Sequence, residues 1–150
     1  MRSGTQNVAG IAAMAAAAAA TVATRTDVVT GIGTKRDRLA DTLLAEVPDT
    51  IESGNRADKV AGSCHLCFAG IESEALLFLL ERSDLMASAA SSCASGAQDP
   101  SHVLAAMGYD RELAKGSLRL SLGYDTTDAD IDRALEVVPP AVAQLRSAGR

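Results

Sequence analysis

The stretch Ser117-Leu118-Arg119-Leu120-Ser121-Leu122 alternates polar and apolar residues from end to end. A period of two is typical of a β-strand with one buried face, because successive side chains point to opposite sides of a sheet. Leu118, Leu120 and Leu122 form the expected buried face. Arg119 lies on the other face, where a cation either pairs at the surface or binds a carboxylate with its planar donors. The pattern leaves both roles of Arg119 open.

A second strand is expected at Ser63-Cys64-His65-Leu66-Cys67-Phe68, a short β-compatible run between glycines. Helices are expected over residues 7–24, which are rich in alanine, and over residues 25–46, which end before Pro48. A further helix is expected over residues 72–82, because leucines recur there at helical spacing.

The C-terminal half carries further boundary signals. Pro100, with Asp99 as its N-cap, predicts a short helix that Gly108 ends, and residues 85–87 favour a short strand. Thr127 predicts the start of a last helix, which Pro139-Pro140 is expected to kink or break. Helices that alternate with short strands predict an α/β fold with a small antiparallel or mixed sheet.

Length, charge and cysteine count restrict the classes of function that are open to this chain. A chain of 150 residues is the size of one domain, and its formal net charge of -5 gives no basic surface for nucleic acid. Three cysteines are an odd number and do not form a secreted disulfide framework, so reduced thiols in the cytoplasm are expected. Residues 8–23 resemble the apolar part of a signal peptide, but the run is mostly alanine, and a buried helix is the favoured alternative.

The motif Cys64-His65-Leu66-Cys67 allows a metal or redox function. On a strand, however, positions 64 and 67 point to opposite faces, and no second pair of ligands follows at zinc-site spacing. Two small core residues are therefore favoured. Neither His65 nor His102 has a carboxylate at a spacing that would mark it as a general base.

Cys93 is the strongest candidate for a reactive group. It lies in the small-residue stretch Ser91-Ser92-Cys93-Ala94-Ser95-Gly96, which predicts a loop ahead of Pro100. A thiol among serine, alanine and glycine is not held in a core, so it can reach chemistry elsewhere. The sequence places no basic residue next to Cys93, so any group that activates the thiolate must come from outside this loop.

Three blocks resemble a known family: Arg2-Ser3-Gly4-Thr5 with Asn7-Val8, the segment SSCASGAQDPSHVLAAMG at 91–108, and SLRLSLG at 117–123 followed by Thr126-Thr127. In order and spacing they are similar to the NifS-like cysteine desulfurases, pyridoxal-phosphate enzymes of the class V aminotransferases. The resemblance implies the small C-terminal α/β domain of the fold type I architecture, with a short sheet covered by helices. Residues 1–47 would be linking helices from a large domain, and residues 48–150 the small domain with the catalytic-cysteine loop.

The same resemblance implies an activity and the residues that carry it. Sulfur would be removed from L-cysteine, leaving L-alanine, and held as a persulfide on Cys93. Arg119 would bind the substrate carboxylate, and Thr5 would bind a phosphate oxygen of the cofactor in a neighbouring subunit of a homodimer. The acceptor would be an iron–sulfur scaffold protein or a tRNA thiolase, with no direct contact to nucleic acid or membrane. Residues 8–23 would be an interior helix rather than a signal peptide.

The departure from the family pattern concerns the cofactor. Relatives hold pyridoxal phosphate with a Schiff-base lysine, a stacking histidine and an aspartate in a preceding large domain, and none of Lys35, Lys59 or Lys115 lies in a matching context. The chain is therefore expected to be inactive alone. The alternatives are a stand-alone persulfide carrier that uses Cys93, and a metal or redox module built on Cys64 and Cys67.

Overall fold

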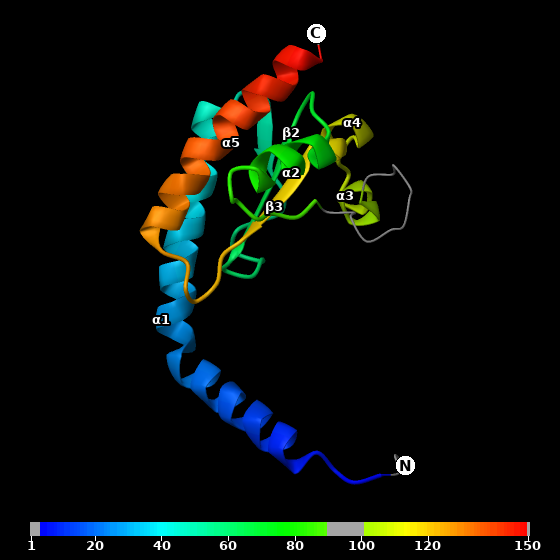
Figure 1. Cartoon of the computed structure of the whole chain (residues 1–150). Coiled ribbons are helices and arrows are strands. Elements are labelled where there is room, and N and C mark those ends of the chain that lie inside the picture. The colour runs from blue at the N-terminus through cyan, green and yellow to red at the C-terminus, as the bar shows by residue number, and fades with distance from the viewer. Residues whose placement is uncertain (1–3, 90–100, 150) are drawn as a thin grey trace.

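A long helix and a three-stranded sheet organise the chain in a computed structural model, which describes residues 4–89 and 101–149 (Figure 1). One half of the long helix lies along the body of the molecule, and the other half projects from it. The elements in chain order are α1 (Val8–Glu46), β1 (Thr50–Glu52), β2 (Ser63–Phe68), α2 (Ser73–Glu81), α3 (His102–Ala106), α4 (Arg111–Lys115), β3 (Ser117–Ser121) and α5 (Asp128–Ala148).

The sheet has the order β1-β2-β3, and both strand pairs are antiparallel. The β-compatible run at 63–68 and the alternating run at 117–122 both form strands, as predicted. An antiparallel or a mixed sheet was expected, and the sheet is antiparallel. In the β2–β3 register, Cys64 lies opposite Leu120 and His65 lies opposite Arg119. The sequence analysis missed β1, which has only three residues, each half-buried. The strand expected over 85–87 is wrong, because pairing there is limited to one bridge between Ser88 and Arg119.

Gly62 and Gly116 lie at opposite ends of the paired strands β2 and β3. The Leu122 N–H donates to the Gly62 carbonyl at 2.8 Å, and the Phe68 N–H donates to the Gly116 carbonyl at 3.0 Å. A Cβ added at Gly62 would lie 2.2 Å from the Leu122 oxygen, and one at Gly116 would lie 2.0 Å from the Phe68 oxygen. Only glycine permits this approach, so both positions fix the alignment of the strands.

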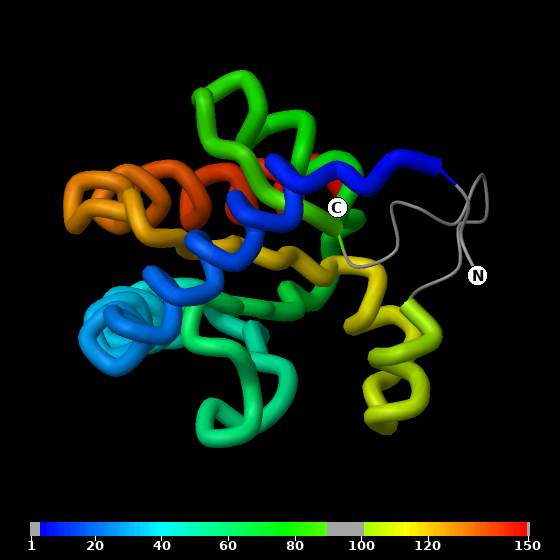
Figure 2. Tube along the Cα trace, turned by 90° about the horizontal axis from the view of Figure 1, so that it is seen from below, coloured from blue at the N-terminus to red at the C-terminus, as the bar shows by residue number. Residues whose placement is uncertain are grey.

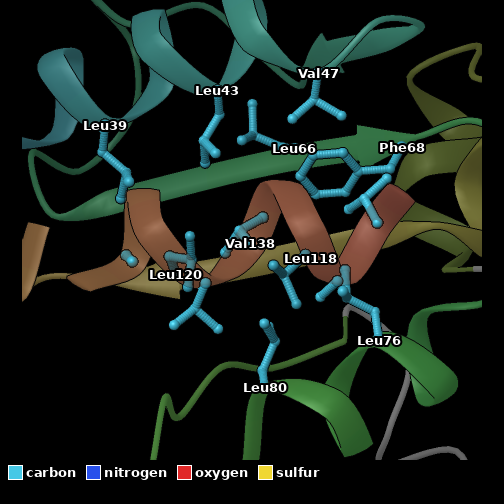
Figure 3. Close-up of a cluster of buried hydrophobic side chains, with 14 of the residues drawn as sticks. Leu39, Leu43, Val47, Leu66, Phe68, Leu76, Leu80, Leu118, Leu120 and Val138 are labelled. Carbon is cyan, nitrogen blue, oxygen red and sulfur yellow. The ribbon is translucent and has the colours of Figure 1, made fainter. Parts of the chain in front are cut away.

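The main core fills the space between one face of the sheet and three helices (Figure 3). It combines side chains from β2 and β3 with side chains from the C-terminal half of α1 and from α2 and α5. A smaller cluster, formed by Cys67, Leu104 and Ala114, lies on the opposite face under α3 and α4. The fully buried large side chains of the main core include Leu39, Leu43, Leu66, Phe68, Leu76, Leu80, Leu118 and Val138.

α1 differs from its prediction in two ways. It is one continuous helix, where two were expected over 7–24 and 25–46, because the backbone stays helical from Thr24 into Arg25. It ends before Pro48, as predicted. The expected burial of the alanine-rich part is wrong for this chain: all residues from 4 to 27 are exposed, because no other described element packs against them. In Figure 2, seen from below, this half passes in front of the rest of the molecule, and Figure 1 shows that it extends away from it. α1 is also long and apolar enough to span a membrane on length and composition alone, a test that core helices and signal sequences also pass.

α5 runs through Pro139 and Pro140, so the break that was one of the two predicted outcomes does not occur. A proline within a helix costs about 3 kcal/mol in isolation, because it removes a donor and crowds the preceding turn. Here Val137, Val138 and Val142 are buried against the core, and their packing holds the helix together across both prolines. Thr127 caps α5 as predicted, in a reciprocal capping box with Asp130.

The short helices also differ in detail. The N-cap of α3 is Ser101, whose side chain accepts from the Val103 N–H at 3.2 Å, rather than Asp99, which lies outside the described residues. Gly108 follows the helix with a φ of 83° and ends it, as predicted. The sequence analysis missed α4, which has only five residues and is capped by Asp110.

Candidate functional site

The sheet has a second face that turns away from the main core and carries most of the sequence-predicted polar groups. Because side chains alternate along a strand, His65 and Cys67 of β2 share this face with Arg119 of β3, whereas Cys64, Leu66 and Leu118 enter the core. Arg119 is exposed and His65 is half-buried. The antiparallel register places His65 and Arg119 directly opposite each other.

The backbone of Arg119 pairs with Ser88 on the side of β3 away from β2. Its N–H donates to the Ser88 carbonyl at 2.7 Å, and the Ser88 N–H donates to the Arg119 carbonyl at 3.0 Å. The guanidinium Nη2 lies 3.5 Å from the Ser88 hydroxyl, a weak contact. Within residues 4–89 and 101–149, no carboxylate forms an ion pair with Arg119. The backbone is therefore fixed while the charge is left un-neutralised, which is what a carboxylate-binding arginine requires.

His65 is tied to Ser53, the residue that follows β1. The Ser53 N–H donates to the His65 carbonyl at 3.0 Å, and the Ser53 hydroxyl forms a hydrogen bond with His65 Nδ1. Burial, followed by the positive charges of Arg119 and Lys59, lowers the pKa of His65. The imidazole is therefore neutral at neutral pH. Sequence reasoning singled out Arg119 but gave His65 no role, because the strand register that pairs them is a tertiary feature.

The two cysteines of the CxxC motif lie on opposite faces of β2, as predicted. Cys64 belongs to the main core and Cys67 to the small cluster, and both are fully buried. Burial, with the negative charge of Glu52 second, raises the pKa of Cys64 to about 12, and burial also raises the pKa of Cys67. Both thiols are protonated and inaccessible. Nor do any three His, Cys, Asp or Glu side chains in the described part of the chain form a group that could hold a metal ion.

Of the other two predicted site residues, Thr5 is described by the structure and Cys93 is not. Cys93 lies outside the described residues, in segment 90–100, which begins two residues after Ser88. Thr5 is exposed and precedes Asn7, the N-cap of α1, whose side chain accepts from the Gly10 N–H at 2.9 Å. That end of α1 projects away from the sheet that contains β3 (Figure 1).

The lysines do not fit a pyridoxal-phosphate site. Lys59 Nζ donates to Glu52 at 2.7 Å and to the Ser53 carbonyl at 3.0 Å, and Lys115 Nζ donates to Glu112 at 2.9 Å. Both are engaged as ammonium donors, whereas imine formation requires a free amine. Lys35 is half-buried on α1. Neither Lys59 nor Lys115 therefore offers the free amine that a Schiff base requires.

A surface hollow lies elsewhere, between the start of α2, α4 and the end of α5. Its apolar wall includes Ile71, Ala75 and Leu145, and its rim carries Glu72 and Glu112. Neither Arg119 nor Thr5 lines it, so it is not the candidate site.

Comparison with known proteins now places the chain. Residues 1–134 match the model of the family described as aminotransferase class-V. The chain belongs to the class V aminotransferase family. It is 45% identical over 151 aligned residues to the "IscS-like cysteine desulfurase" of Mycobacterium tuberculosis, covering 99% of this chain and 38% of the relative. It is also 41% identical to the "Cysteine desulfurase IscS" of Methanosarcina thermophila, covering 97% of this chain and 36% of that protein.

Solved structures agree on this class V fold. The NifS-like protein from Rickettsia africae superposes with a TM-score of 0.80 at 25% identity, covering 95% of this chain and 36% of that structure. A second NifS-like protein gives a TM-score of 0.79 at 26% identity. The resemblance to NifS-like desulfurases and the α/β fold type are thereby confirmed. The chain spans between 36% and 38% of the length of the two curated relatives described above.

Proposed function

We propose that this chain is the C-terminal part of a cysteine desulfurase, which removes sulfur from L-cysteine to leave L-alanine and holds it as a persulfide on Cys93. The observation that carries the proposal is the un-neutralised guanidinium of Arg119, whose backbone is held between β2 and Ser88. Ser88 lies two residues ahead of the segment with Cys93. The relatives that match nearly the whole chain are named cysteine desulfurases, which supports the same activity.

In this proposal Arg119 binds the carboxylate of L-cysteine and Cys93 receives its sulfur. Pyridoxal phosphate, the cofactor of the family, withdraws electrons from the bound amino acid when present. Because the lysines described here are engaged elsewhere, its site is supplied by residues beyond this chain, with Thr5 touching the phosphate in the partner subunit of a homodimer. The chain alone is inactive, acts in the cytoplasm, and passes sulfur to an acceptor for iron–sulfur assembly or tRNA thiolation.

The test is alanine formation from L-cysteine by the purified chain with pyridoxal phosphate and a reductant, before and after addition of the N-terminal part of the Mycobacterium tuberculosis relative. We expect no alanine from the chain alone and alanine after complementation, and a Cys93→Ser variant should abolish it. Alanine from the chain alone would show that it builds a cofactor site itself. Complemented protein that yields no alanine, but accepts sulfur on Cys93 from a polysulfide, would favour the persulfide carrier.

Arg119 is tested in the same complemented assay. Arg119→Lys keeps the charge but loses the planar pair of donors, so the KM for L-cysteine should rise by about tenfold, the loss of roughly one charge-assisted hydrogen bond. Arg111→Lys is the matched control, because Arg111 lies on α4 and outside the candidate face. An unchanged KM for Arg119→Lys would mean that Arg119 does not bind the substrate carboxylate and is a surface residue.

A further inference from the structure

We propose that His65 is a positioning residue for the carboxylate site of Arg119: its imidazole, fixed by Ser53, lies opposite Arg119 on the same face of the sheet and gains proton affinity when a carboxylate binds there. This inference rests on the proposed role of Arg119 in holding a substrate carboxylate. It assigns His65 a task that the sequence did not indicate.

The first step is the placement of the two side chains. His65 and Arg119 are directly opposite in the antiparallel pair of β2 and β3, on the face away from the core. Cβ atoms of directly opposed residues lie about 4.5–5.5 Å apart, so an imidazole and a guanidinium at these positions are neighbours. Ser88 holds the other side of Arg119 through its backbone, so the guanidinium is flanked by His65 and by Ser88.

The second step is the protonation of the imidazole. The Ser53 hydroxyl lies 3.3 Å from the His65 carbonyl and is also bonded to His65 Nδ1. If the hydroxyl donates to the carbonyl, Nδ1 carries the ring proton and donates to the hydroxyl oxygen, and Nε2 keeps its lone pair. No hydrogen bond to Nε2 occurs among the described residues. A neutral ring leaves the charge of Arg119 intact, whereas an acidic residue at position 65 would cancel it.

The third step concerns the charges around His65. Arg119 faces it from β3 and Lys59 from the turn after β1, and Lys59 is itself paired with Glu52. The hydroxyl of Tyr109, which follows α3, accepts from the Gly54 N–H at 3.3 Å and adds no charge. A carboxylate bound to Arg119 offsets the nearer cation, so it raises the proton affinity of His65. By linkage, the carboxylate binds more tightly at pH values where His65 is protonated.

The experiment is an NMR titration of the whole chain labelled uniformly with ¹⁵N, so that histidine, arginine and amide resonances are all followed, with acetate as the probe and chloride at equal ionic strength as the control. The chain has two histidines, and His102, exposed on α3, is the internal reference. We expect acetate to raise the pKa of His65 by about half a unit, which corresponds to about threefold tighter acetate binding to the protonated form. His102 should respond equally to acetate and chloride.

Three variants define the result. Arg119→Gln should raise the pKa of His65 without acetate and abolish the acetate effect. Arg119→Lys should keep that pKa low and weaken the acetate effect. His65→Asn, which keeps a side chain able to bond Ser53, should bind acetate with no pH dependence beyond that of the ionisation of acetate itself. Amide spectra of each variant report whether the sheet is intact.

Two outcomes overturn the inference and separate it from the proposed function. If acetate shifts the side-chain resonance of Arg119 but not the titration of His65, His65 has no positioning role, while the carboxylate site of Arg119 stands. If acetate changes neither the side-chain resonance of Arg119 nor the titration of His65, Arg119 does not bind carboxylates, and His65 has no positioning role.

Discussion

Cys64 and Cys67 lie on opposite faces of β2, one in the core beneath α1 and the other against α3 and α4. Both are fully buried, and burial raises the pKa of each thiol. A thiolate is the form that reacts with alkylating agents, so neither cysteine has an accessible reactive form in the native protein.

A Cys93→Ser variant, which carries only these two thiols, should therefore not react with iodoacetamide until it unfolds. Mass spectrometry along a urea titration checks this, and both thiols should become modified together with the loss of helical signal. Cys64→Ala in the same background is the matched control and should show one protected thiol. Rapid modification of either cysteine in the native state would contradict the buried positions.

The buried His65 predicts a loss of stability in mild acid. Its pKa in the folded chain lies below the unperturbed value of 6.5, so the unfolded chain binds the proton more readily. Its contribution is complete above pH 6.5 and is lost as the pH falls through the folded-state pKa.

The midpoint of urea unfolding should therefore decrease from pH 7 to pH 5, and His65→Asn should reduce that decrease. His102→Asn, a change on exposed α3, should leave it unaltered. Equal pH dependence in the wild type and His65→Asn would mean that other groups cause the decrease.

The capping box at the start of α5 should be measurable as stability. The Thr127 hydroxyl accepts from the Asp130 N–H at 3.2 Å, and the Asp130 carboxylate accepts from the Thr127 N–H at 2.7 Å. Thr127→Ala removes the first bond and should cost about 1 kcal/mol in the free energy of unfolding. Thr21→Ala, in the exposed half of α1, should change it by less than about 0.5 kcal/mol. If Thr127→Ala and Thr21→Ala lower the free energy of unfolding by similar amounts, the cap makes no specific contribution to stability.

The projecting half of α1 should contribute little to the stability of the body. Residues 4–27 are all exposed, and this half carries the apolar side chains of Val8, Ile11 and Met14 in solvent. Deletion of residues 1–24 should leave the thermal midpoint within a few degrees of the full chain, because no core contact is lost. It should also abolish concentration-dependent association, since exposed apolar surface favours self-contact.

Calorimetry and light scattering of the full and shortened chains decide this. A large drop in the thermal midpoint would mean that these residues pack against the body in solution. A full-length chain that is monomeric at every concentration would contradict the expected association.

Local sequence signals were sufficient to predict an element where the pattern lay within that one segment. The alternation in residues 117–122 gave β3, the run between two glycines gave β2, and Thr127 marked the start of α5. These features depend on neighbours within a few residues, so periodicity and capping chemistry reveal them. The opposite orientation of Cys64 and Cys67 follows from the same local rule.

The sequence by itself thus determined the two longer strands, most helix boundaries and the residues that match the desulfurase family. Only the tertiary structure decided which residues meet: β1 forms because β2 offers it a partner, and α5 continues through Pro139 and Pro140 because the core holds its valines. The pairing of His65 with Arg119 joins positions far apart in the chain. Strand register and helix packing are set by the burial of distant side chains against each other, and no local pattern encodes that.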